Sequence, residues 1–217
     1  MKEINSTYNI DTLISRYPAL SAVREELLGA FEILRSCYGN GGKLLCCGNG
    51  GSAADSEHIV GELMKSFKMK RPLRGERAEA LRAFGAEGEL LAESLEGAMT
   101  AIALTGHTAL SSAFANDKNP TLVFAQQVEG YGRKGDVLLT LTTSGNSQNC
   151  VYAAITARSK GMRVISVTGK SGGAVERYSD VCLKLPETET YLVQELTLPV
   201  YHWLCAELEV CFPEGTA

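Results

Sequence analysis

Two side chains that could share a proton or a ligand lie close together within the stretch Lys43–Phe67. His58 and Glu62 are four residues apart, so in a helix they occupy the same face. An imidazole and a carboxylate placed in this way can bind one small ligand or one metal ion. The simpler interpretation is an exposed His–Glu pair without a function. The glycine-rich turn Gly48–Ser52 just before them favours the functional interpretation.

That turn joins an apolar run to a helical pattern. Lys43–Cys47 is typical of a buried parallel strand, and apolar residues after Ser52 recur at intervals of three and four. We expect Ser52 or Asp55 to cap the helix. A strand, a glycine turn and a helix N-terminus can bind an anion, because glycines allow close approach of the backbone and the helix dipole favours negative charge. The turn is neither a Walker loop nor GxGxxG, so a purely structural turn is the alternative.

A second turn, rich in hydroxyl groups, follows another predicted strand. Thr143, Ser144 and Ser147 can donate hydrogen bonds to a phosphate without adding a fixed positive charge. Ser147 or Asn146 could also serve as the N-cap of the next helix. Because parallel strands end at the same edge of a sheet, we expect both turns to face one crevice, which would suit a phosphate monoester.

The elements that must position these residues alternate along the chain. Strands are predicted at 43–47, 99–104, 136–140, 163–167 and 181–185, with helices between them, a loop at Asn116 and Asp117, and a terminal helix over 188–211. This alternation indicates an α/β fold with a doubly wound parallel sheet flanked by helices. Residues 1–40 add an N-terminal helical segment that could pack against a neighbouring subunit. Residues 70–97 form a charged helical excursion, either a lid or an interface arm, and Pro199 should kink the terminal helix.

Composition limits the classes of function. The 217 residues suit one domain over 1–217, and a net charge of −4 argues against nucleic acid as a main partner. A small anionic ligand remains compatible with this charge.

No segment has the length of a membrane span or the apolar core of a signal peptide, so we expect a cytoplasmic protein without a membrane partner. The seven cysteines are interpreted as small buried residues in a reducing compartment, and the lack of CxxC argues against a thiolate zinc site.

Several motifs together resemble the phosphoheptose isomerase branch of the sugar isomerase (SIS) domain family. They are CGNGGSAAD at 47–55 followed by His58 and Glu62, TTSGNS at 142–147, and Gln194 and His202 eight residues apart. The similarity covers about residues 40–70 and 99–212. It implies a homotetramer with active sites between subunits, which interconverts sedoheptulose 7-phosphate and D-glycero-D-manno-heptose 7-phosphate.

The resemblance also implies roles for individual residues. It assigns substrate binding to Asn49, Gly50, Gly51, Ser52, Glu62, Asn116, Asp117, Thr142, Thr143, Ser144, Ser147 and Gln194. It assigns zinc binding, in members that contain zinc, to His58, Glu62, Gln194 and His202. Glu62 and His202 match the acid/base pair, which agrees with a reaction that moves a proton between C1 and C2 through an enediol. Glu62 would be the base at carbon and His202 would move protons at the oxygens, although a ligand role and a base role for Glu62 compete.

Proteins with other functions share this fold. A non-catalytic relative such as the DnaA initiator-associating protein has the glycine turn but lacks the equivalents of Glu62 and His202. A ligand-sensing SIS module usually carries a DNA-binding domain, and no basic extension is present here. The excursion at 70–97 departs from the usual family pattern. An isomerase for a different sugar phosphate therefore stays open.

Overall fold

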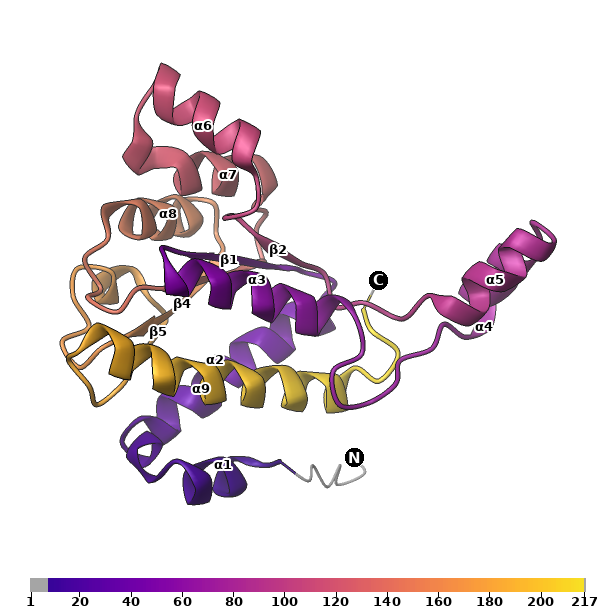
Figure 1. Ribbon diagram of the computed structural model, residues 1–217, viewed down its shortest axis with the longest axis horizontal. Coiled ribbons are helices and arrows are strands. Elements are labelled where there is room, and N and C mark those ends of the chain that lie inside the picture. The colour runs from indigo at the N-terminus through magenta and orange to yellow at the C-terminus, as the bar shows by residue number, and fades with distance from the viewer. Residues whose placement is uncertain (1–7, 217) are drawn as a thin grey trace.

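The computed structural model describes residues 8–216, and a parallel sheet of five strands lies at its centre (Figure 1). The strands are β1 (Leu44–Gly48), β2 (Ala101–Ala103), β3 (Val137–Leu141), β4 (Arg163–Thr168) and β5 (Val181–Lys184). Their order is β2-β1-β3-β4-β5, and every pair is parallel. The predicted α/β fold, its parallel sheet and the position of each strand are confirmed.

Helices cover both faces of the sheet. Leu44 and Cys46 of β1 are buried on the face covered by α2 (Arg24–Gly39), α3 (Gly51–Met64) and α9 (Thr190–Cys211). Leu45 and Cys47 are buried on the opposite face, against α7 (Val123–Tyr131) and α8 (Gln148–Ser159). Because successive strand residues point to opposite faces, a strand covered on both sides is apolar throughout, and this made the strands visible in the sequence.

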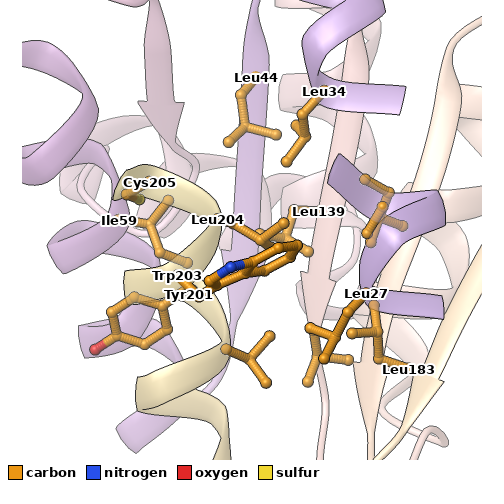
Figure 2. Close-up of a cluster of buried hydrophobic side chains, with 14 of the residues drawn as sticks. Leu27, Leu34, Leu44, Ile59, Leu139, Leu183, Tyr201, Trp203, Leu204 and Cys205 are labelled. Atoms are coloured by element: carbon orange, nitrogen blue, oxygen red, sulfur yellow. The ribbon is translucent and has the colours of Figure 1, made fainter. Parts of the chain in front are cut away.

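The N-terminal helices pack against their own sheet. They are α1 (Ile10–Arg16), the 3-10 helix η1 (Pro18–Val23) and α2, and their residues Leu13, Leu20 and Leu27 are fully buried. Trp203 of α9 lies among side chains from α2 and from the strands (Figure 2). The predicted helical segment is therefore confirmed from residue 10 onward, whereas its residues 1–7 lie outside the described part of the chain.

The terminal helix is continuous through its proline. Pro199 is buried inside α9, which runs from Thr190 to Cys211. A proline lacks an N–H, so one intrahelical hydrogen bond is absent there, but the helix does not end. The residues that precede and follow the proline can thus be placed on one helix.

The predicted excursion is a helical hairpin. It consists of α4 (Gly75–Arg82) and α5 (Ala86–Ser94), and it extends away from the sheet (Figure 1). Gly85 separates the two helices with a φ of 77°. At the base of the hairpin, Pro72 and Glu96 form an antiparallel bridge. We call α4 and α5 the arm.

The remaining elements are α6 (Thr108–Asp117) and the 3-10 helices η2 (Pro120–Leu122) and η3 (Glu176–Tyr178). The sequence predicted a loop at Asn116 and Asp117, which is wrong, because these are the last two residues of α6. Across residues 8–216, no helix is both long and apolar enough to span a bilayer.

Candidate active site

The two predicted turns lie side by side at the carboxyl edge of the sheet. Gly48, the last residue of β1, pairs with Leu141, the last residue of β3. The strand order reverses direction between these two strands, and ligands bind at such a switch point in doubly wound sheets. The side chains of Asn49 and Asn149 join the two sides, because each amide nitrogen donates to the other residue's amide oxygen, at 3.0 and 2.8 Å.

Glycine is required at two positions of the first turn. Gly50 has a φ of 57°, which a residue with a side chain rarely adopts. At Gly51 the reason is different, since a Cβ atom there would lie 2.7 Å from the Nε2 atom of Gln194. The predicted N-caps Ser52 and Asp55 are wrong. Gly50 is the N-cap residue of α3 and no side chain caps this helix, because the chain is already helical from Gly51.

The second turn is closed by its own backbone and hydroxyl groups. Gly145 donates its N–H to the carbonyl of Thr142 at 2.9 Å, and the Thr142 hydroxyl donates to Ser147 Oγ at 3.2 Å. Ser147 is the N-cap residue of α8 without a side-chain hydrogen bond, so the predicted capping bond is absent. The side chain of Asn146 instead accepts a hydrogen bond from the backbone N–H of Ala174. Ser144 is exposed, so a phosphate could reach it.

A chain of polar side chains connects α3 with α9. Tyr201 Oη donates to Asp55 Oδ1 at 3.2 Å and lies 2.9 Å from Nδ1 of His58. The other ring nitrogen of His58, Nε2, lies 3.2 Å from Glu62 Oε1. On the far side of that carboxylate, the Lys65 ammonium group lies 3.1 Å from Oε2. Both carboxylate oxygens of Glu62 therefore have a partner.

The environment keeps the Tyr201 proton in place. Burial and the neighbouring Asp55 raise the pKa of Tyr201 well above its ordinary value, and burial also raises the pKa of Asp55. If the single hydroxyl proton is donated to Asp55, the Nδ1 atom of His58 must donate to the tyrosine oxygen. The Nε2 atom of His58 then faces Glu62, and this contact is a hydrogen bond only if a proton lies between them.

His202 lies against this chain of side chains. Its ring centroid is 5.1 Å from that of His58 and 5.4 Å from that of Phe67. Burial and the neighbouring His58 lower the pKa of His202, against the opposing effect of Glu62. A neutral imidazole is therefore favoured at this position, and a neutral imidazole can both accept and donate a proton.

Other predicted site residues lie apart from this group within one chain. Gln194 packs on Gly51, at the start of α3, and Glu62 lies eleven residues further along that helix. At 1.5 Å per residue this is about 16 Å. Asn116 donates to Asp117 Oδ1 at 2.9 Å, and both side chains are exposed. Apart from this bond between them, neither forms a hydrogen bond with a predicted site residue among residues 8–216.

Buried charges fix the end of α3 near Glu62. The guanidinium group of Arg71 donates to backbone carbonyls at the C-terminus of α3, including that of Leu63 at 3.0 Å, and pairs with Glu209 at 3.4 Å. The side chains of Arg71 and Glu209 are 0% and 1% exposed. Glu209 also accepts three backbone N–H bonds, from the consecutive residues Phe67, Lys68 and Met69. Cations suit a helix C-terminus, so this pair holds α3 and the chain after it in place.

Sequence reasoning missed four polar residues of the site. Asp55 shares the helix face of His58 and Glu62, at spacings of three and seven, so its position could have been inferred. Lys65 follows Glu62 by three residues, so its contact could have been inferred in the same way. Tyr201 and Asn149 have no such signal, because their contacts depend on how α9 and α8 are placed in space, which the local pattern does not specify.

The donor types in this group fit zinc, which takes imidazole nitrogens and carboxylate oxygens. His58, Glu62 and His202 supply such atoms from adjoining helices. Within residues 8–216, however, no three His, Cys, Asp or Glu side chains are already arranged to hold a metal ion. Both ring nitrogens of His58 have partners, so at least one of these bonds would have to open for His58 to bind a metal.

Comparison with known proteins defines the class first. A family model described as SIS domain matches residues 11–103 and 81–169. The two matched stretches together cover the first four strands and the whole of the predicted crevice. The fold is therefore that of a SIS domain protein.

Relatives of known activity narrow this class. The phosphoheptose isomerase of Aromatoleum aromaticum is 38% identical over 198 residues, which are 90% of this chain and 87% of that protein. The structure of a phosphoheptose isomerase from Neisseria gonorrhoeae has a TM-score of 0.70 at 31% identity, covering 91% of this chain and 93% of the other. A Francisella tularensis phosphoheptose isomerase gives the same TM-score of 0.70 at 30% identity, covering 95% of this chain and 96% of the other. The chain belongs to the SIS domain family and, within it, to the phosphoheptose isomerases.

Proposed function

We propose that this protein interconverts sedoheptulose 7-phosphate and D-glycero-D-manno-heptose 7-phosphate. The observation that carries the proposal is the group formed by His58, Glu62 and His202, which lies on the helix that starts at the glycine turn and on its neighbour. An imidazole and a carboxylate in contact, beside a second imidazole, suit a reaction whose difficult step is proton transfer at carbon. Membership of the phosphoheptose isomerases supports this choice of substrate.

The two turns would bind the phosphate and the sugar. Backbone groups of Asn49 to Ser52 and the hydroxyls of Thr142, Thr143, Ser144 and Ser147 offer hydrogen bonds at one edge of the sheet. These groups carry no fixed charge, so they can release a phosphorylated product. Asn116, Asp117 and Gln194 would orient the sugar hydroxyls.

The proton transfers would be divided between Glu62 and His202. Glu62 takes the proton from one carbon of the substrate and returns it to the neighbouring carbon. His202 moves protons at the two oxygens, because its neutral imidazole can both accept and donate. Tyr201 holds the ring of His58, and His58 holds the carboxylate of Glu62.

We also propose that zinc assists the reaction. His58, Glu62, Gln194 and His202 would hold the ion, and Gln194 would be its weakest ligand. Zinc polarises a carbonyl group and stabilises negative charge on its oxygen. Dialysis against a chelator followed by zinc titration, with metal content measured on the same samples, tests this step. Full activity in metal-free protein would contradict it.

The last part of the proposal is a homotetramer with active sites between subunits. It is supported by the position of Gln194, which packs on Gly51, eleven residues or about 16 Å along α3 from Glu62. Light scattering measures the oligomer. A mixture of Glu62→Gln and Ser144→Ala/Ser147→Ala, refolded together, tests the shared site: we expect regained activity, because some mixed sites would combine an intact Glu62 with an intact phosphate turn. No gain in a mixture shown to contain hybrids would exclude a shared site.

The experiment that tests the function itself is turnover of sedoheptulose 7-phosphate, with other ketose and aldose phosphates as parallel substrates. We expect turnover by the wild type and a loss of 100-fold or more, roughly, for Glu62→Gln and for His202→Ala. Glu57→Gln is the matched control, because Glu57 lies on the same helix and, among residues 8–216, its carboxylate accepts a hydrogen bond from Thr105 and from no residue of the candidate site. Preference for a different sugar phosphate would correct the substrate, and no turnover of any would contradict the isomerase function.

A further inference from the structure

We propose that Lys65 is a further catalytic residue, whose ammonium group stabilises the negative charge that forms on a substrate oxygen while Glu62 holds the proton taken from carbon. The proposal rests on the isomerase function proposed above. It names a residue of this chain whose ammonium group lies beside the proposed base.

The first observation is the geometry of the Lys65 ammonium group. Its Nζ atom lies 3.1 Å from Glu62 Oε2 and 3.1 Å from the carbonyl oxygen of Ser66. An ammonium group has three N–H donors, and these two contacts use two of them. Within the described part of the chain no third acceptor is bonded to it. Because the Lys65 side chain is 60% exposed, a bound substrate can reach the remaining donor.

The second observation is that the base itself is largely covered. The Glu62 side chain is only 14% exposed, and His58 contacts its Oε1 atom. Lys65 contacts the other oxygen, so a substrate carbon that approaches Oε2 also comes within reach of the ammonium group. Because Nζ and Oε2 are 3.1 Å apart, a substrate that places C1 at Oε2 can place its C2 oxygen within hydrogen-bonding distance of the ammonium group.

The third observation separates Lys65 from an ordinary surface lysine. Exposed ion pairs three residues apart contribute little to stability. Here the backbone on both sides is fixed: the carbonyl of Lys65 accepts a hydrogen bond from the buried Arg71 guanidinium group, and Glu96 accepts from the N–H and hydroxyl of Ser66 at 2.8 and 2.6 Å. The Lys65 side chain extends from this fixed backbone, and its two contacts with Glu62 and Ser66 orient the ammonium group toward the site where charge develops.

Atoms and electrons balance in the proposed step. From the ketose, Glu62 accepts the proton on C1, the electron pair of that C–H bond forms the C1–C2 double bond, and the carbonyl pair moves onto O2. Lys65 donates a hydrogen bond to O2 at this stage and keeps its own proton. Glu62 then returns its proton to C2, the O1–H electron pair forms the C1 carbonyl as the O1 proton leaves, and His202 passes that proton to O2, which gives the aldose with its C2 hydroxyl. No electrons leave or enter the system, so no redox partner is needed.

The test compares four forms of the full-length protein, with sedoheptulose 7-phosphate as substrate. We expect Lys65→Met to lower kcat by about 100-fold or more while KM changes little, because the charge acts in the transition state. Lys65→Arg should keep part of the activity. Lys68→Met is the matched control, since Lys68 is exposed three residues away and its ammonium group lies over the Tyr8 ring rather than near Glu62.

Two further readouts distinguish a catalytic charge from a structural one. Ethylammonium added to Lys65→Ala should restore turnover in a saturable way. A phosphorylated aldonohydroxamate resembles the enediolate, and its Kd should rise from wild type to Lys65→Met by the same factor by which kcat falls. The Kd of the ketose phosphate should stay the same in both proteins. Two outcomes would overturn the proposal and leave the isomerase function standing. The first is an active wild type together with a kcat of Lys65→Met within twofold of the wild-type value. The second is a slow Lys65→Met whose affinity for the analogue is unchanged, together with a Lys65→Ala that ethylammonium does not rescue. A wild type without turnover would instead refute both.

Discussion

The end of α3 and the arm are neighbours in sequence but are held in opposite ways. The end of α3 is fixed by Arg71 and Glu209, whose side chains are almost fully buried, and it packs against α9. The arm begins a few residues later, yet Phe84 is 76% exposed and Leu90 is 63% exposed. The proposed chemistry belongs to the first region, where buried polar contacts fix side-chain positions. In the second region few contacts oppose change, so substitutions should have little effect on a single chain.

The largest effect should follow from breaking the buried ion pair. Glu209→Ala leaves Arg71 charged without its partner and three backbone N–H groups without an acceptor. We expect a loss of about 3–5 kcal/mol in the free energy of unfolding, measured by urea denaturation. Glu195→Ala, at an exposed position of the same helix, is the control. A loss below about 1 kcal/mol would show that this pair does not fix the end of α3.

A smaller effect is expected where the two turns are joined. Asn149→Ala removes the partner of the Asn49 side chain at the carboxyl edge of the sheet. Because Asn49 is predicted to bind substrate, we expect KM to rise by roughly tenfold, which corresponds to about one hydrogen bond, with an unchanged unfolding midpoint. Steady-state kinetics on purified protein checks this. Gln148→Ala, at the exposed start of the same helix, should leave KM unaltered.

The lowered pKa of His202 makes stability depend on pH. In the unfolded chain an imidazole takes up a proton as pH falls through about 6.5, whereas burial and His58 keep His202 neutral to lower pH in the folded chain. The unfolded state binds more protons in that interval, so the free energy of unfolding falls as pH falls through it. The wild type should therefore lose more stability than His202→Gln between about pH 7 and about pH 5. Parallel pH profiles of the two proteins would contradict this.

The smallest effect should come from the arm. Phe84→Ser and Leu90→Ser remove exposed side chains, and we expect changes within about 0.5 kcal/mol in the free energy of unfolding of one chain. Leu204→Ala in the buried cluster is the contrast, with an expected cost of about 2–5 kcal/mol (Figure 2). A concentration-dependent loss of stability in the arm variants would show that a second copy covers these side chains.

The sequence predicted the sheet well because both of its faces are buried. A short, continuous apolar run such as Leu44–Cys47 is what a strand covered on both sides requires. Because the strands are parallel, the turns that follow them lie at the same edge of the sheet, so the position of the glycine-rich turns was also predictable. His58 and Glu62 were placed together because helix geometry fixes residues four apart. In these cases a local rule determines a contact, and the prediction was correct.

Contacts between distant elements could not be predicted in this way. Tyr201 meets Asp55 and His58 only because α9 packs beside α3, and 143 residues separate Tyr201 from His58 in sequence. Asn149 likewise meets Asn49 across 100 residues of sequence, because α8 starts beside the turn that follows β1. The start of α3 was also placed wrongly, since a hydroxyl was taken as the cap although Gly50 adopts a positive φ there.

The most direct test of the proposed mechanism is the isomerisation carried out in deuterium oxide, with the product examined by mass spectrometry. A carboxylate that exchanges its proton with solvent while the enediol is bound delivers deuterium to carbon. We therefore predict product with carbon-bound deuterium, formed at the wild-type rate of turnover, and no such product from Glu62→Gln. Labelled product formed by Glu62→Gln as fast as by the wild type would contradict the central claim that this carboxylate moves the proton.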